Sequence, residues 1–294
     1  MSVPKIKRVP GGGTFIVRSK YTHKWRQKQG DNNWPFLGDL GCCPVDSSSK
    51  ITYCEFEPTM VSTTPSTPLI RQASDHSFLV TFGEGISRFH HRDVLRFFRL
   101  LSSNPDRAIV NLHPAYNSLL ISFDPFVKQP KELLGYIHML LNQLDTVEAK
   151  KSELIEIPVC YDRTFAPDLE FVATHNGLRS EDVIRLHASA EYLVYFIGFS
   201  PGFPYMGELP VELSTPRLTT PRVHVPAGSV AIGGNQTGIY STASPGGWRI
   251  IGRTPLSLFD PHRDRPSVLQ MGDSVRFKSI SLEEYQIMLH GNAA

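Results

Sequence analysis

A dense mixture of glycine, proline, aromatic residues and arginine fills residues 196–254 and constrains the fold more than any other stretch. Glycine lets the backbone adopt a positive φ, whereas proline fixes φ and removes a hydrogen-bond donor. Apolar side chains suited to a core stand between them: Val225, Val230, Ile232, Ile239, Ile250 and Ile251. The pattern therefore predicts short strands joined by rigid turns, as in an antiparallel barrel or sandwich.

Length, charge and cysteine content narrow the class of protein. The chain has 294 residues, 40% of them hydrophobic, which is enough for one large or two ordinary domains. A net charge of +2 gives no reason to expect a nucleic-acid or membrane partner. No apolar run reaches the roughly 18 residues of a membrane span, and no secretory segment follows Met1. The cysteines, Cys42, Cys43, Cys54 and Cys160, match neither a zinc pattern nor a disulfide framework. We expect a cytoplasmic protein with free thiols and no metal.

Residues 1–67 differ in composition from the rest of the chain. The first thirty contain several lysines and arginines but no acidic residue, and a Ser/Thr/Pro-rich tract follows at 62–68. Because apolar periodicity is poor, we predict a disordered or atypical N-terminal extension. Either a targeting peptide or a start codon placed too far upstream would explain it.

Residues 68–152 are predicted to form a small α/β domain. The expected elements are strands at 77–82, 108–113 and 118–123, a helix at 91–101 and a second helix from Pro130. The order β-α-β-β-α is that of a ferredoxin-like unit without its last strand. Residues 153–162 either supply that strand or lead into the next domain.

Residues 153–294 are predicted to form a barrel domain, so the fold class is α+β. Two short helices are expected to begin at Pro167 and after an N-cap at Ser180. Strands are then expected at 191–199, 229–234, 248–252, 255–259 and 273–278. The two helices could form a helix-turn-helix, but acidic residues on the second would repel phosphates, which argues against DNA binding.

Several familiar catalytic patterns are absent from the sequence. There is neither a phosphate-binding loop of the Gly-x-x-x-x-Gly-Lys type nor a Gly-x-Gly-x-x-Gly motif after a strand. Ser229 does not sit in a nucleophile elbow. His90 and His91 are adjacent, and neighbours on a helix do not face each other as metal ligands would.

Polar and cationic side chains among the rigid loops remain as candidates. Arg217 and Arg222 each follow a proline, and Arg253 directly follows the predicted strand segment 250–252. Guanidinium groups bind carboxylate or phosphate in bidentate fashion. We therefore expect these three arginines to converge on one hollow that binds an anion. The alternative is that the arginines bind loop carbonyls and the glycines only make turns.

Three long motifs resemble those of a known family. They are GFSPGFPYMGELP at 198–210, TPRVHVPAGSVAIGGNQTGIY at 220–240 and SPGGWRIIGRTPLSLFDP at 244–261. They are similar to the KipI / allophanate hydrolase subunit 1 family, which includes the bacterial B subunits of 5-oxoprolinase. The resemblance implies a small ferredoxin-like α/β N-terminal domain followed by a cyclophilin-like antiparallel β-barrel. It also implies kinship with the carboxyltransferase-like region of urea carboxylase.

The resemblance also implies a function. Members of this type work with the C and A subunits of the same enzyme in ATP-dependent opening of 5-oxoproline to glutamate. We expect a hydrolase subunit that is inactive alone. Mg-ATP is the expected cofactor, and one arrangement would bind it across the boundary between subunits. One branch of the family instead inhibits a sensor histidine kinase, which is the alternative function. A prolyl isomerase has only the expected barrel in its favour, and a fold does not determine function.

Each candidate residue is assigned a role on this basis. His187, His224 and Gln236 are the predicted catalytic residues, because histidine transfers protons and glutamine can orient a ligand. The predicted substrate- or phosphate-binding residues are Arg217, Arg222, Arg253, Ser200, Tyr205, Tyr240 and Thr254.

Overall fold

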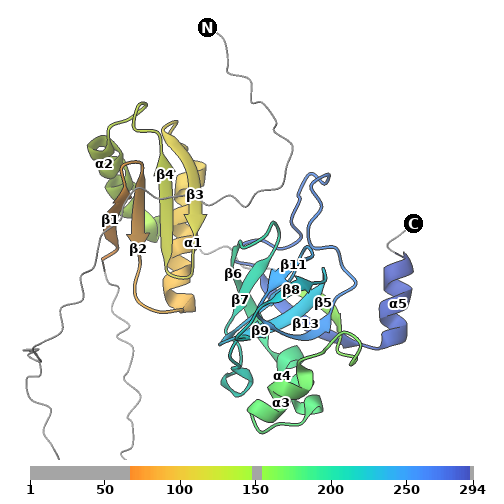
Figure 1. The fold of residues 1–294 in the computed structure, drawn as a ribbon. Helices are drawn as coiled ribbons and strands as arrows, with labels where there is room; N and C mark the ends of the chain where they lie inside the picture. The colour runs from red at the N-terminus through yellow and green to blue at the C-terminus, as the bar shows by residue number, and fades with distance from the viewer. Residues whose placement is uncertain (1–66, 148–153, 292–294) are drawn as a thin grey trace, which may run out of the picture. The chain divides into compact units, whose positions relative to one another are not determined.

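A four-stranded antiparallel sheet and a closed seven-stranded barrel contain most of the strands (Figure 1). The computed structural model describes residues 67–147 and 154–291. The predicted extension lies outside the described residues, apart from residue 67. Among the described residues, no helix combines the length and the apolar composition that a membrane span requires.

The four-stranded sheet carries two helices on one face. Its elements are β1 (Leu69–Ser74), β2 (Ser77–Thr81), α1 (Arg88–Ser103), β3 (Ile109–Pro114), β4 (Ser118–Phe123), α2 (Pro130–Leu141) and the short 3-10 helix η1 (Leu144–Thr146). The helices and strands predicted here from the sequence are confirmed. The Ser87 side chain caps α1 by accepting from the Phe89 amide at 3.1 Å, and Pro130 occupies the first turn of α2.

Alternation along the strands explains which face is covered. Val80 on β2 and Ile121 on β4 are fully buried, together with Phe97 of α1 and Ile137 of α2. In a strand, residues two apart point to the same side, so these apolar side chains form one core beneath both helices.

The fourth place in this sheet is taken by β1. The strand order is β1-β2-β4-β3, so β1 pairs with β2 at one edge. Residues 153–162 had two possible roles, and the structure shows that β5 (Leu154–Cys160) belongs to the barrel. A two-residue connection after Ser74 makes β1 the nearer partner for β2, because sequential strands joined by tight turns pair readily.

The barrel is closed in the order β10-β7-β6-β13-β5-β12-β9. Besides β5, its strands are β6 (Glu191–Ile197), β7 (Pro204–Gly207), β9 (Ser229–Gly233), β10 (Gln236–Ile239), β12 (Arg249–Arg253) and β13 (Ser274–Ile280). Outside it, β8 (Arg222–Val225) and β11 (Ser244–Gly246) form a two-stranded sheet. The remaining elements are α3 (Leu169–His175), α4 (Ser180–Ser189), η2 (Val211–Leu213) and α5 (Leu282–Gly291).

The expected α+β class and barrel are confirmed, with three corrections. The barrel is not wholly antiparallel, because β5 and β13 pair in parallel, and the long chain between them supplies the crossover that parallel neighbours need. The strand expected at 255–259 is wrong, since only an isolated bridge joins Phe259 to Ser267. Ser180 is the first residue of α4 and not its cap, which is Arg179.

The helices α3 and α4 share the barrel core. Val172 of α3 and Val183 of α4 are fully buried in the same cluster as Val159, Val230 and Phe277 of the barrel strands. The proline- and glycine-rich loops are thereby held on a rigid frame, as a preformed binding site requires.

Candidate functional site

The loop between β6 and β7 brings two phenylalanines together. Phe199 has a φ of 66°, in the left-handed region that non-glycine residues rarely adopt. The Gly198 amide donates to the Phe203 carbonyl at 3.0 Å, which closes the turn. The two phenylalanine rings are therefore 5.4 Å apart. Phe199 remains 62% exposed, whereas Phe203 is buried.

A small cavity, which we call the aromatic pocket, opens beside this loop. Its volume is about 180 Å³. Its walls come from β7 and the loop before it, the loop before β8, and the ends of β10, β11 and β12. They are Phe199, Phe203, Tyr205, Arg217, Leu218, Pro221, Tyr240, Gly246, Gly247 and Trp248. The pocket thus lies within the stretch that dominates the sequence.

The aromatic rings of the pocket pack mainly edge to face. Phe203 meets Trp248 at 5.6 Å and 84°, and Tyr240 at 5.3 Å and 79°. Such tilted pairs are favoured by the ring quadrupoles and fix the positions of the walls. Gly246 allows the approach of Tyr240, because a Cβ at Gly246 would stand 2.2 Å from the Tyr240 hydroxyl.

Arg217 supplies the positive charge of the pocket. Its guanidinium carbon lies 5.4 Å from the centre of the Trp248 ring. A cation over an indole face is attracted by the negative face of the ring. Burial raises the pKa of both the Tyr205 and Tyr240 hydroxyls, and the charge of Arg217 lowers them by a smaller amount. Both tyrosines are therefore protonated at neutral pH and able to donate.

The three arginines expected to converge do not do so. Arg217 lines the aromatic pocket, whereas the Arg222 guanidinium donates to the Asp168 carboxylate at 2.8 Å. Arg253 donates to the Ala227 carbonyl at 3.0 Å and lies over the Phe165 ring. The prediction of a shared hollow is wrong, because two of the guanidiniums are used to hold loops in place.

Asp168 determines the position of the Arg222 side chain. It is 5% exposed, and its second oxygen accepts from the Ile250 amide at 2.7 Å. Arg249 adds a longer ion pair to the same carboxylate at 3.9 Å while stacking on Phe171 at 3.6 Å. This buried carboxylate therefore ties the start of α3 to β8 and β12.

His187, a predicted catalytic residue, lies in the barrel core. Its ring is fully buried, hydrogen-bonds Tyr161 at 2.8 Å and Thr237 at 2.9 Å, and stacks on Phe277 at 4.4 Å. Burial lowers the pKa of His187 to about 3, because the charged ring would lose its hydration. Its contacts indicate a structural role, and its complete burial argues against proton transfer to a ligand by this ring.

The other predicted residues are spread around the pocket or away from it. Tyr205 and Tyr240 line it. Gln236 is buried; burial raises the pKa of the nearby Tyr116 hydroxyl, and Gln236 lowers that pKa by less, while the Tyr116 ring lies 6.3 Å from that of Tyr205. Ser200 lies in the loop beside Phe199, 3.5 Å from the Ser241 hydroxyl.

Two predicted residues stand apart from the pocket. His224 is exposed on β8. Thr254 is buried, and its hydroxyl accepts from the Leu256 amide at 3.3 Å. Their predicted functional roles remain predictions.

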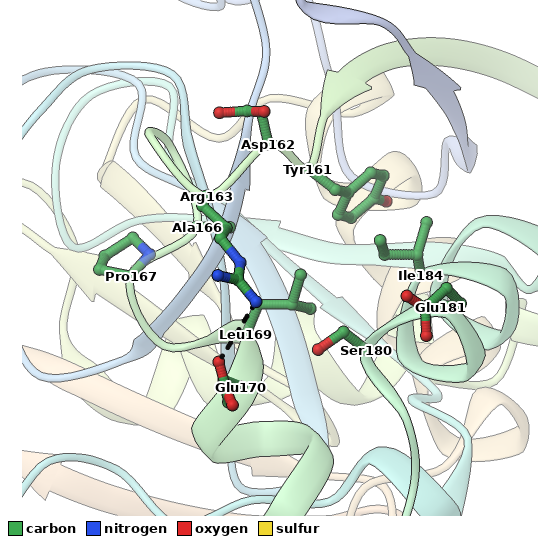
Figure 2. Close-up of a pocket in the computed structure, with 10 residues that line it drawn as sticks. All are labelled: Tyr161, Asp162, Arg163, Ala166, Pro167, Leu169, Glu170, Ser180, Glu181 and Ile184. Carbon is green, nitrogen blue, oxygen red and sulfur yellow. Dashed lines mark ion pairs between the residues drawn. The ribbon is translucent and has the colours of Figure 1, made fainter.

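A larger cavity of about 560 Å³ lies against α3 and α4 (Figure 2). Tyr161, Leu169 and Ile184 line it among other residues. An ion pair, drawn dashed in Figure 2, joins Arg163 to Glu170 at 3.8 Å, and both side chains are exposed. None of the predicted site residues lines this cavity, so the aromatic pocket is the stronger candidate. Residues 67–147 and 154–291 contain no group of three His, Cys, Asp or Glu side chains that could hold a metal.

Sequence reasoning missed part of the pocket. Phe199, Phe203 and Trp248 were not singled out, although two glycines precede Trp248 and leave room for close approach. Asp168 was missed too, although an aspartate directly after Pro167 stands where a helix start favours negative charge.

The comparisons with known proteins agree with the motifs. The family model described as carboxyltransferase domain, subdomain C and D, matches residues 68–269. The chain is 50% identical over 172 residues to the 5-oxoprolinase B subunit of Escherichia coli O157:H7, which covers 58% of this chain and 77% of that protein. It is 37% identical over 226 residues to the 5-oxoprolinase B subunit of Bacillus subtilis, with 74% and 94% covered.

Solved structures share the fold. The crystal structure of TTHA0988 superposes with a TM-score of 0.62 at 37% identity, over 72% of this chain. The urea carboxylase of Kluyveromyces lactis gives a TM-score of 0.62 at 25% identity, over 76% of this chain. The chain spans 40% of the first of these proteins and 23% of the second. By its motifs, its barrel and these matches, the chain belongs to the carboxyltransferase domain, subdomain C and D family, and within it to the proteins that resemble KipI and the 5-oxoprolinase B subunit.

Proposed function

We propose that this chain is the B subunit of an ATP-dependent 5-oxoprolinase, which acts with the C and A subunits to open 5-oxoproline to glutamate. The observation that carries the proposal is the 37% identity to such a B subunit over 94% of that protein's length. A match that spans nearly a whole relative supports a shared role more strongly than a match to one motif.

The chemistry explains why ATP is needed. A lactam is a resonance-stabilised amide that resists attack by water. Transfer of the γ-phosphoryl group to the lactam oxygen would release ADP and make the ring carbon electrophilic. Water then adds to that carbon, the ring nitrogen departs as the amine, and a second water hydrolyses the resulting acyl phosphate to glutamate and phosphate. Catalysis of this type depends on positioning and on stabilising negative charge.

The aromatic pocket is smaller than most nucleotide sites. The pocket has about 180 Å³, whereas sites for cofactors and drug-sized ligands usually exceed about 300 Å³. The proposal therefore places the nucleotide outside the aromatic pocket, with a boundary to another subunit as one arrangement, and gives the aromatic pocket the role of holding the small lactam.

Reconstitution tests the proposal. The A and C subunits are mixed with and without this chain, and glutamate formed from 5-oxoproline in the presence of Mg-ATP is measured. We expect glutamate only when all three are present, and none from this chain alone. Equal glutamate formation with and without this chain would contradict the proposed role.

A further inference from the structure

Arg217 differs from the arginines around it in having no polar partner. Arg222 and Arg249 share the Asp168 carboxylate, and Arg253 donates to a loop carbonyl. In the described part of the chain, no hydrogen bond or ion pair engages the Arg217 guanidinium, whose contact is with the face of Trp248. A cation–π contact uses no hydrogen bond, so the N–H donors of this guanidinium stay free.

The cavity beside this arginine suits a small ring. Its volume of about 180 Å³ is that of about six water molecules at about 30 Å³ each. Phe203, Tyr240 and Trp248 are each at most 6% exposed, so these walls are preformed and apolar. A ring that enters displaces water from apolar surface, which favours binding. A charged substituent on such a bound ring would lie at the opening of the pocket, where Arg217 is exposed.

Phe199 stands at the same mouth. Its side chain is 62% exposed and its backbone is in the left-handed region. Its ring lies 6.2 Å from that of Tyr240, at 88°. Strained backbone of this kind persists where surrounding structure enforces it, often beside ligands. The exposed ring thus extends the apolar wall toward the position of the incoming ligand.

We propose, on the basis of the function proposed above, that the aromatic pocket binds the five-membered ring of 5-oxoproline and that Arg217 binds its carboxylate. The guanidinium fork pairs with the two carboxylate oxygens, while the aromatic walls enclose the ring. Arg217 is then the residue that distinguishes a lactam acid from an uncharged lactam.

The discriminating experiment compares 5-oxoproline with its carboxamide in the complex of this chain with the A and C subunits. The two lactams have nearly the same shape and differ in the negative charge. For each, kcat/KM is measured, or the inhibition constant where the amide is not turned over. With the wild-type chain, we expect the acid to be preferred roughly ten- to hundredfold, the usual effect of a charged hydrogen-bonded contact.

Arg217→Gln should bring the ratio of acid to amide close to one, by raising KM for the acid. Arg217→Lys, which keeps the charge but not the fork, should restore part of the preference. Arg265→Gln is the matched control, because Arg265 is exposed and has no partner among the described residues. It should keep the full preference. The ratio is taken within one protein preparation, so a partly unfolded variant does not distort it.

The outcomes separate this inference from the proposed function. If the complex opens 5-oxoproline and Arg217→Gln keeps the wild-type ratio, the assignment of the pocket is wrong and the function stands. If the wild-type complex opens no lactam, the function fails, and calorimetric titration of the purified chain with the acid and the amide decides about the pocket. A preference for the acid that depends on Arg217 would uphold the pocket, and equal affinities would overturn it.

Discussion

At the scale of single residues, burial decides which polar side chains are available for chemistry. His187 looked catalytic in the sequence because histidine is the commonest proton-transfer group. Its surroundings of Tyr161, Thr237 and Phe277 make it instead a neutral, hydrogen-bonded part of the core. The sequence around residue 187 does not predict that it is buried, because the strands that enclose it are distant in sequence.

The burial of His187 predicts a pH dependence of stability. The pKa of His187 is lowered to about 3 in the folded chain from 6.5. Below pH 6.5 the unfolded chain therefore binds a proton that the folded chain excludes. The free energy of unfolding is unaffected by this group above pH 6.5 and falls as the pH drops toward 3. One such proton costs about 1.4 kcal/mol per pH unit.

Urea unfolding above and below pH 6.5 measures this effect. His187→Gln cannot take up the proton, so its free energy of unfolding should fall less steeply with acid than that of the wild type. His91, whose burial also lowers its pKa, to about 4, is present in both proteins, so the difference reports on His187. Identical slopes would show that residue 187 is not the excluded group.

Asp168 predicts a second effect at this scale. Asp168→Ala should lower the free energy of unfolding by about 3 kcal/mol, because Arg222 and Arg249 would lose their buried counter-charge. The Ile250 amide would also lose its acceptor. Urea unfolding of the variant and the wild type measures the loss.

Glu170→Ala provides the control on the same helix. Glu170 is 80% exposed and pairs with the exposed Arg163 across 3.8 Å. Surface pairs contribute little, so this variant should unfold like the wild type. A stability loss as large in Glu170→Ala as in Asp168→Ala would refute the tie between α3, β8 and β12.

At the scale of elements, periodicity and turn residues predicted most of the small sheet. Leu133 and Ile137 recur at helical spacing in α2, and alternation marks β2 and β4. Strand β1 was missed because Leu69–Ser74 is exposed along most of its length and shows no alternating apolar pattern. The short strands β7, β8, β10 and β11 were also missed, since four residues or fewer carry too little pattern.

Gly233 on β9 supports the pocket from behind. A Cβ at Gly233 would stand 2.6 Å from the Trp248 ring. Gly233→Ala should therefore displace Trp248 and cost about 1–3 kcal/mol, the usual effect of overpacking. Urea unfolding measures the cost, and reduced affinity for 5-oxoproline should accompany it.

Gly135→Ala is the matched glycine control. Gly135 lies within α2, and nothing stands within 4 Å of a Cβ placed there. Alanine is the better helix former by about 0.8–1.0 kcal/mol, so this variant should be slightly more stable than the wild type. If Gly233→Ala were as well tolerated, Trp248 would not depend on the missing side chain.

At the scale of the whole molecule, the motifs predicted the family and the barrel but not the arrangement of the site. The expectation that Arg217, Arg222 and Arg253 meet rested on the similar proline- and glycine-rich loops that carry them. The sequence alone does not show that Arg222 instead forms an ion pair with Asp168, which lies far from it along the chain. Arg217, Tyr205 and Tyr240 do line one pocket, because glycine and proline turns bring the ends of neighbouring strands to one place.

In the proposed function, this chain takes part in an ATP-coupled lactam opening. The most direct test of that role measures glutamate and phosphate in one reaction of the A and C subunits with this chain, started with 5-oxoproline and Mg-ATP. We predict that both products form in equal amounts and that both cease when this chain is left out. Phosphate released without glutamate, or glutamate formed at the same rate without this chain, would contradict the account.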